Sequence, residues 1–178
     1  MNTMPDWLSH LGLAYVFSFV PGVINEEQPH EHRVLLFIGS VMLDFSRPFS
    51  LIAIYFLDYN TAQLLGQFSY LSLHSIIGAL LLAGLLSPLF FNYSFKQAYF
   101  LLILGGFSHL LLDMTMWPWT GGVLLFFPLQ TQRYSFRLIW PGNYYIPLLF
   151  GLPLTSLAFF HLLRDFKKSR GIVQENLS

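Results

Sequence analysis

The stretch FSYLSLHSIIGALLLAGLLSPLFFNYSFKQAYFLLILGGFSHLLLDMTMW, residues 68–117, decides how this chain folds. It contains two apolar runs, residues 68–91 and 98–117, separated by a short polar turn near Ser94. A helix that spans a bilayer needs roughly 20 mostly apolar residues at 1.5 Å rise per residue, and both runs meet that length. Because the turn is short, the two runs are predicted to form an antiparallel helical hairpin in a membrane.

Three titratable side chains interrupt this apolar hairpin. His74 lies 20 residues before Ser94, whereas His109 and Asp113 lie 15 and 19 residues after it. At an equal rise per residue, His74 and Asp113 lie at nearly the same depth. His109 and Asp113 are four residues apart and therefore share one face of their helix. Ionisable side chains inside a spanning segment are costly and by default indicate function, so these three residues are candidate site residues.

The composition of the whole chain also indicates a membrane protein. Of its 178 residues, 54% are hydrophobic and 10% are charged, whereas a soluble domain carries about 25% charged residues. Nine basic and nine acidic residues cancel, which leaves no broad basic field to attract nucleic acid. The absence of cysteine excludes disulfides, thiolate metal sites and cysteine nucleophiles. We expect residues 1–178 to form a single, all-α, membrane-embedded domain.

Other apolar segments extend the hairpin to a multi-pass bundle of about five transmembrane spans. The additional predicted spans are residues 7–24, 33–43 and 144–163, of which the first two are weaker. Residues 48–65 are broken by polar side chains and are interpreted as an interfacial or re-entrant piece. Basic residues after the last span, such as Arg164 and Lys167, predict a cytoplasmic C-terminus and, by alternation, an N-terminus outside.

This topology divides the chain into three parts. Residues 1–129 hold the candidate site, residues 130–143 form an outer loop, and residues 144–178 form the last span and a basic cytoplasmic tail. Asp44 and His10 fall at the outer ends of their spans, in the same layer as the titratable residues of the hairpin. Imidazoles and carboxylates together suit zinc, with manganese or iron as other possibilities. We therefore predict a site for one or two divalent ions near the outer face, with His10, Asp44, His74, His109 and Asp113 as ligands.

The same residues carry a resemblance to a known family. GGFSHLLLDMTMWPWTGGVLLFFPL, residues 105–129, resembles the hallmark G-x-x-S-H-x-x-x-D-x-x-T-x-x-G…P of the LexA-regulated, inner-membrane metal-dependent hydrolases. FIGSVMLDFSRPFS, SYLSLHSIIGALLLA and SHLGLAY resemble three further segments of that family. The family is distantly similar to zinc-dependent phospholipase C and single-strand nucleases. The resemblance implies a bacterial inner-membrane location and a phospholipase-C-like helical core. It also implies a first metal held by Asp44, His74, His109 and Asp113, and a second held by His10 and a bridging Asp113.

If the chain is an enzyme, the expected reaction is hydrolysis of a phosphoester of a lipid head group. A divalent ion lowers the pKa of its bound water to about 7 and so supplies hydroxide near neutral pH. Asp44 or Asp113 could accept the proton of that water, and Arg47, three residues from Asp44, is the third candidate catalytic residue. Guanidinium groups bind phosphate bidentately, so Arg47, Arg133 and Arg137 are the candidate substrate-binding residues.

Two other functions stay open at this point. The same His/Asp cluster could bind a cation or relay protons in a transport protein, although no internal repeat of the kind common in transporters is evident. The chain could also be a decayed, non-catalytic member of the hydrolase family, since Ser46 and Arg47 stand where that family has a second acid and a histidine. Turnover of lipid would separate the enzyme from both alternatives. Protein partners cannot be predicted from these residues.

Overall fold

The computed structural model describes residues 7–24, 29–45, 55–58, 60–61, 72–115, 122–139 and 145–175. Within these ranges the regular secondary structure is helical, while residues 122–139 are irregular and contain an isolated bridge between Val123 and Tyr134. The α-helices are α1 (Trp7–Phe17), α2 (Pro29–Val41), α5 (Ile76–Leu86), α6 (Phe95–Thr115) and α7 (Tyr145–Glu175), and the 3-10 helices are η1 (Met42–Phe45) and η2 (Ser87–Leu89). The predicted all-α class is therefore confirmed for the described residues.

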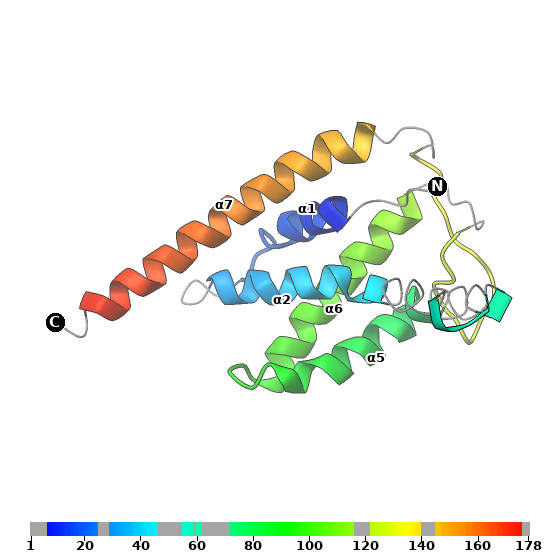
Figure 1. Ribbon diagram of the computed structural model, residues 1–178, viewed down its shortest axis with the longest axis horizontal. Coiled ribbons are helices and arrows are strands. Elements are labelled where there is room, and N and C mark those ends of the chain that lie inside the picture. The colour runs from blue at the N-terminus through cyan, green and yellow to red at the C-terminus, as the bar shows by residue number, and fades with distance from the viewer. Residues whose placement is uncertain are drawn as a thin grey trace.

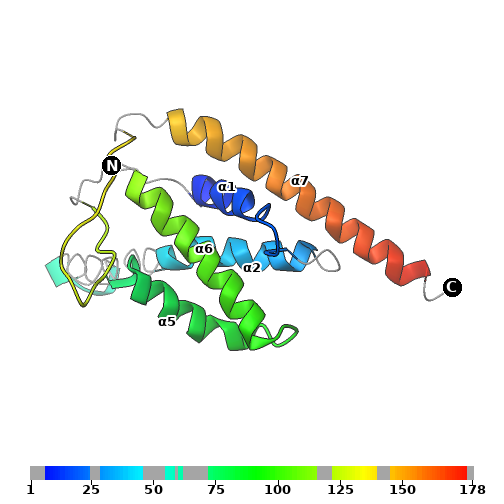
Figure 2. The same cartoon turned by 180° about the vertical axis from the view of Figure 1, so that it is seen from behind.

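Helix α6 lies at the centre of the arrangement (Figure 1). Helices α1, α2 and α5 all pack against it, and α7 packs mainly along α1. The same order is seen from behind, where α7 lies on the outside of α1 and runs far beyond it to the C-terminus (Figure 2). The N-terminal helices α1 and α2 and the preceding helix α5 therefore meet at α6, which carries two of the predicted metal ligands.

Helices α5 and α6 form the predicted antiparallel hairpin, as Figure 1 shows. Ser75 caps the start of α5, because its hydroxyl accepts a hydrogen bond of 2.9 Å from the Gly78 amide. In the hairpin turn, Ser94 and Gln97 cap the start of α6: the Gln97 amide donates to the Ser94 hydroxyl, and the Gln97 side chain accepts from Ser94. The turn near Ser94 is thus defined by its own side chains.

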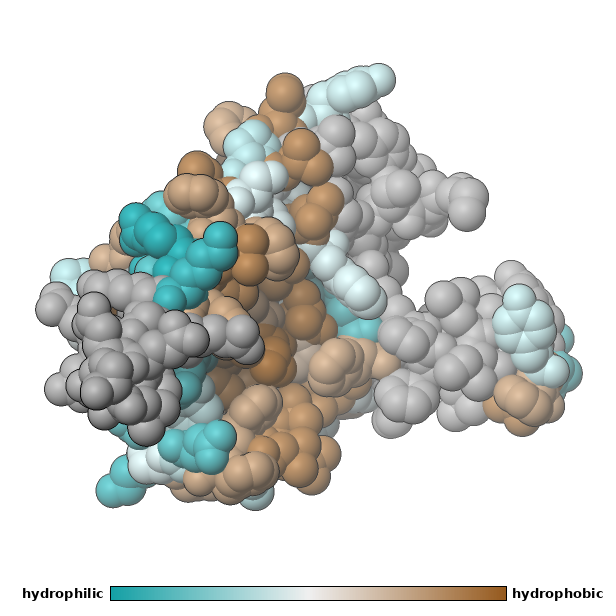
Figure 3. Space-filling view, turned by 60° about the vertical axis from the view of Figure 1, so that its left-hand side comes forward, coloured by the Kyte–Doolittle hydropathy of each residue, from teal (hydrophilic) through white to brown (hydrophobic). Residues whose placement is uncertain are grey.

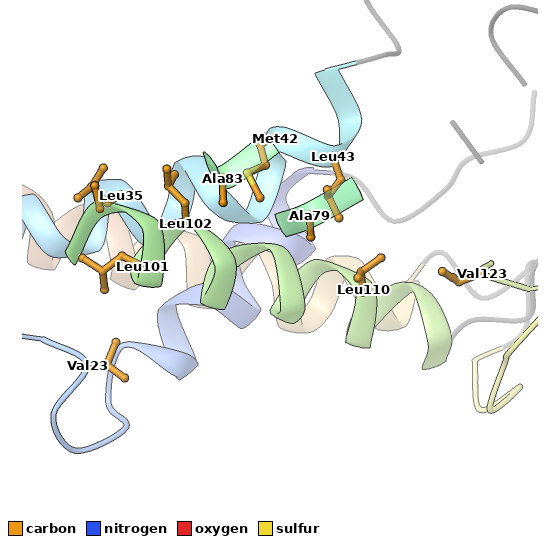
Figure 4. Close-up of a cluster of buried hydrophobic side chains, with 11 residues drawn as sticks. Val23, Leu35, Met42, Leu43, Ala79, Ala83, Leu101, Leu102, Leu110 and Val123 are labelled. Atoms are coloured by element: carbon orange, nitrogen blue, oxygen red, sulfur yellow. The ribbon is translucent and has the colours of Figure 1, made fainter. Parts of the chain in front are cut away.

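Glycines let α2 and α6 approach closely. A Cβ atom added to Gly39 of α2 would overlap the backbone carbonyl of Leu102, and one added to Gly105 of α6 would overlap that of Leu36. Small residues at a helix crossing are how membrane helices achieve backbone contact. Next to this crossing lies a cluster of buried apolar side chains between α2, α5 and α6, drawn in Figure 4, which includes Leu35, Met42, Ala79, Ala83 and Leu102.

Polar contacts attach α7 to α1 and α2. The Thr155 hydroxyl donates to the Leu8 carbonyl at 2.6 Å, and the Tyr15 hydroxyl lies 2.8 Å from Nδ1 of His161. Further along α7, the nearly buried Asp165 pairs with the equally buried Arg33 of α2. The helix is thereby fixed to the rest of the fold at several points along its length.

Many large apolar side chains lie on the outside of the molecule. Figure 3 shows a broad hydrophobic surface, and α5, α6 and α7 each expose leucine or phenylalanine side chains. Monomeric soluble proteins rarely expose apolar surface on this scale, whereas lipid solvates it at little cost. The distribution of apolar side chains therefore fits a protein that lies in a membrane.

Among the described helices, α6 is the one that is both long and apolar enough to span a bilayer. Helix α1 and the α5–η2 segment are apolar but shorter. The expected first span, residues 7–24, differs from the structure because α1 ends at Phe17 and turns follow it. Pro21 cannot continue the hydrogen-bond ladder and Gly22 adopts a left-handed conformation with φ of +82°, so the segment changes direction there.

The other predicted spans fare unevenly. Residues 33–43 lie in α2 and η1, and residues 145–163 of the last predicted span belong to α7, which continues to Glu175. Most of residues 48–65, the expected interfacial piece, lie outside the described residues. The five-span count, the direction of the chain and the phospholipase-C-like character of the core remain predictions.

Candidate metal centre

Three helical elements and one helix start bring the five predicted ligands together. His10 comes from α1, Asp44 from η1, and His109 and Asp113 from successive turns of α6. His74 immediately precedes Ser75, the cap of α5. All five side chains are buried, with at most 6% of any of the five residues exposed. The sequence predicts that these residues lie at the same level of the helices, and the structure brings their side chains into one buried cluster.

Asp113 lies at the middle of the cluster, and its two oxygens face different histidines. Oδ1 lies 3.6 Å from Nε2 of His10. Oδ2 lies 3.4 Å from Nε2 of His109 and 3.8 Å from Nε2 of His74. One carboxylate thus faces two separate groups of imidazoles, an arrangement that suits a ligand shared between two ions.

Asp44 completes the cluster on the side of His74. Its Oδ1 lies 3.3 Å from Nε2 of His74. Its Oδ2 accepts a 3.0 Å hydrogen bond from the indole Nε1 of Trp7. The indole therefore fixes the orientation of the carboxylate, as partners outside the ligand shell commonly do in metal sites.

The imidazole of His109 is oriented by the backbone of α2. Its Nδ1 donates to the Ser40 carbonyl at 2.6 Å, which leaves the Nε2 lone pair directed at Asp113. The ring also stacks on His10 with centroids 3.7 Å apart, and it meets His74 edge-on with centroids 5.1 Å apart. The hydrogen bond fixes the tautomer that leaves Nε2 available to a metal, and the ring contacts fix the orientation of the imidazole.

The separations between donor atoms are the most informative feature of the cluster. At 3.3–3.8 Å, they exceed the usual length of a hydrogen bond, about 2.7–3.2 Å. Donors about 2.0–2.2 Å from one ion in a tetrahedron lie roughly 3.4 Å apart, which follows from the bond lengths alone. Buried Nε2 of His10, Nε2 of His109 and Oδ2 of Asp113 also have no hydrogen-bond partner among the described residues. Buried polar atoms are normally satisfied, so a cation fits this cluster better than hydrogen bonding does.

Two overlapping sets of residues have the spacing to bind an ion. One consists of His10, His109 and Asp113, and the other of Asp44, His74 and His109. Within each set the donor atoms lie within 4.8 Å of one another. The residues present therefore fit one or two divalent ions without rearrangement of the helices.

The three arginines predicted to bind substrate are not among the described residues that the structure brings together at the five ligands. Arg47 lies outside the described residues. Arg133 and Arg137 are exposed in the irregular segment 122–139, whereas the five ligands are buried. That segment is hydrogen-bonded to the start of α5 and the end of α6: the Leu125 carbonyl accepts from the Ile76 amide, and the Phe136 amide donates to the Met114 carbonyl. The segment therefore borders the metal centre, while a role for either arginine stays a prediction.

Two partners of the ligands escaped prediction. Trp7 lies three residues before His10 and so on the same face of α1, which was a usable signal. The Ser40 contact is made by a backbone carbonyl, so no side-chain pattern could reveal it.

Comparison with known proteins identifies one relationship that covers nearly the whole chain. A family model described as the YdjM inner membrane protein matches residues 6–175. No curated protein and no solved structure matches the chain. The matched range includes all five residues of the candidate metal centre.

Proposed function

Because the chain belongs to the YdjM inner membrane protein family, we propose that it is a membrane-bound, metal-dependent hydrolase that cleaves a phosphoester of a lipid head group. The observation that supports this most strongly is the convergence of five buried donors with metal-like separations. A membrane protein meets phosphoesters chiefly as lipid head groups, so lipid is the natural substrate.

The two oxygens of Asp113 support an assignment of ligands to two ions. Oδ2 faces His109 and His74, so Asp44, His74, His109 and Asp113 would hold the first ion. Oδ1 faces His10, so these two groups would contribute to the second. One imidazole nitrogen binds one ion, and His109 therefore belongs to the first. This mixture of nitrogen and oxygen donors suits zinc, with manganese or iron as alternatives.

The protein groups at the centre have distinct tasks in this proposal. A divalent ion held by these residues would supply a water of lowered pKa and stabilise charge on the phosphoryl group. Asp44 and Asp113 are the acceptors available for the proton of that water, and the Trp7 indole holds Asp44 in place. The hydrogen bond to the Ser40 carbonyl orients the imidazole of His109 toward Asp113.

A second candidate function is cation or proton handling without hydrolysis. It is favoured by the burial of all five donors, because a chain of buried imidazoles and carboxylates can also carry a cation or a proton. A decayed hydrolase would keep the same geometry. Both alternatives predict metal or proton binding without release of a lipid product.

The test is phosphoester turnover by the purified, metal-loaded protein in vesicles of bacterial phospholipids. We expect released head-group or phosphate product from the wild type and loss of that product in Asp113→Asn. The matched control is Asp58→Asn, because Asp58 is exposed and hydrogen-bonds to Thr61 outside the centre. Metal-loaded wild-type protein that releases no product from any phospholipid class would reject the hydrolase in favour of the alternatives.

A further inference from the structure

An apolar groove lies against the outer face of α5, beside the metal centre. Its volume is about 230 Å³. It is lined by residues before α5, by one face of that helix and by the turn of segment 122–139, namely Ser72, Ser75, Leu81, Leu85, Phe127 and Pro128 with their neighbours. Because nearly all of this lining is apolar, the groove is suited to a hydrocarbon ligand.

One end of the groove is lined by the chain neighbours of His74, although His74 itself is buried and is not part of the lining. Ser72, Leu73 and Ser75 line that end, and they flank His74, which faces inward to Asp44 and Asp113. The Ser75 hydroxyl donates to the Ser72 carbonyl and accepts from the Gly78 amide. This hydroxyl is therefore engaged within the protein, so the polar edge of the groove does not require a polar ligand.

The other end of the groove runs along α5 toward the hairpin turn. From Ser75 to Leu85 the helix rises roughly 15 Å. Leu81 and Leu85 line this stretch and are 69% and 72% exposed. Phe127 and Pro128 close the opposite wall, and the hydrogen bond from the Ile76 amide to the Leu125 carbonyl holds that wall against α5. The groove thus has a fixed wall on each side and follows a helix that leads away from the ligands.

We propose that the groove binds one acyl chain of the lipid whose head group reaches the metal centre. This inference rests on the proposed function and specifies its substrate as an acylated lipid phosphoester rather than a water-soluble one. Three observations select this occupant: the apolar lining, the position of Leu73 and Ser75 on either side of His74, and the membership of an inner membrane protein family.

The test is photo-crosslinking to a phosphatidylglycerol analogue that carries a diazirine within one acyl chain. The protein is reconstituted in phosphatidylethanolamine–phosphatidylglycerol vesicles with the probe, irradiated, and the labelled peptides are located by mass spectrometry. We expect residues 77–85 to be labelled in higher yield than the lipid-facing side of α7. Leu81→Trp, which fills the groove, should lower that labelling about tenfold, the effect of losing roughly two buried methylenes.

Leu149→Trp is the matched control, because Leu149 of α7 is 67% exposed and does not line the groove. It should leave the labelling of residues 77–85 unchanged. Equal labelling of α5 and α7, or a Leu81→Trp protein labelled like the wild type, would overturn the groove proposal. An absence of label on residues 77–85 because a second copy of the chain covers this face would also overturn the proposal.

Metal content measured on the same samples separates this inference from the proposed function. Bound metal with no preferential labelling of α5 overturns the groove and leaves the hydrolase proposal standing. Labelling confined to the groove in a protein that binds no metal supports the acyl-chain site but rejects the hydrolase.

Discussion

His10 of α1 and His109 of α6 stack face to face, with ring centroids 3.7 Å apart and ring planes 6° apart. Two protonated imidazoles at this distance would repel each other strongly in a buried site. Metal ligation requires neutral imidazoles and so removes that conflict. The stack also packs α1 against α6 next to Asp113, so one contact serves both the fold and the metal centre.

His10→Phe separates these two roles. Phenylalanine keeps an aromatic ring on His109 but supplies no nitrogen to an ion. We expect the metal content per chain to fall while the unfolding temperature in detergent stays close to that of the wild type. The measurements are metal analysis and thermal unfolding followed by circular dichroism. Unchanged metal content in a folded variant would place His10 outside the ligand set.

Trp7→Phe tests the support of Asp44. The substitution removes the 3.0 Å hydrogen bond to Oδ2 but keeps an aromatic side chain. Loss of such a partner typically lowers metal affinity about 10–100-fold, and competition with a chelator measures the change. Tyr55→Phe is the control, because Tyr55 is 88% exposed. Equal affinities in Trp7→Phe and the wild type would show that the indole does not orient the carboxylate.

Gly105→Ala tests the close crossing of α2 and α6. The added methyl would overlap the Leu36 carbonyl and force the helices apart. Overpacking of this kind lowers the free energy of unfolding by about 1–3 kcal/mol or more. Gly84→Ala is the control, since its Cβ would come no nearer than 3.7 Å to Tyr99 and alanine favours a helix. Thermal unfolding in detergent compares the two. Equal stability of both variants would contradict the tight crossing.

The Arg33–Asp165 pair tests how α7 is held. Removing one partner of a buried pair typically costs about 3–5 kcal/mol, so Arg33→Ala should strongly destabilise the protein. Arg164 lies 3.6 Å from the same aspartate but its side chain is 61% exposed, so Arg164→Ala should cost about 0–1 kcal/mol. Denaturation in mixed micelles gives both values. A larger effect from Arg164→Ala would show that the exposed pair holds α7 instead.

Much of the metal centre could be predicted because its geometry follows from helical repeats. The four-residue spacing of His109 and Asp113 and the capped turn at Ser94 determine where His74 meets them. The end of α1 at Phe17 shortens the predicted span of residues 7–24, which contains Pro21 and Gly22, because the apolar run continues past the point where the helix stops. Contacts made through backbone carbonyls and the groove beside α5 depend on packing between distant segments, which no local pattern records.

The most direct test of the metal centre is the metal content of the detergent-purified protein beside a His109→Ala/Asp113→Ala double variant. Both proteins are loaded with excess zinc, manganese or iron, desalted, checked for helical content and analysed by mass spectrometry. We expect about one or two ions per wild-type chain and none in the folded double variant, because both ligand sets lose His109 and the shared carboxylate. No bound ion in the wild type after loading, or equal metal in the two proteins, would contradict the metal centre.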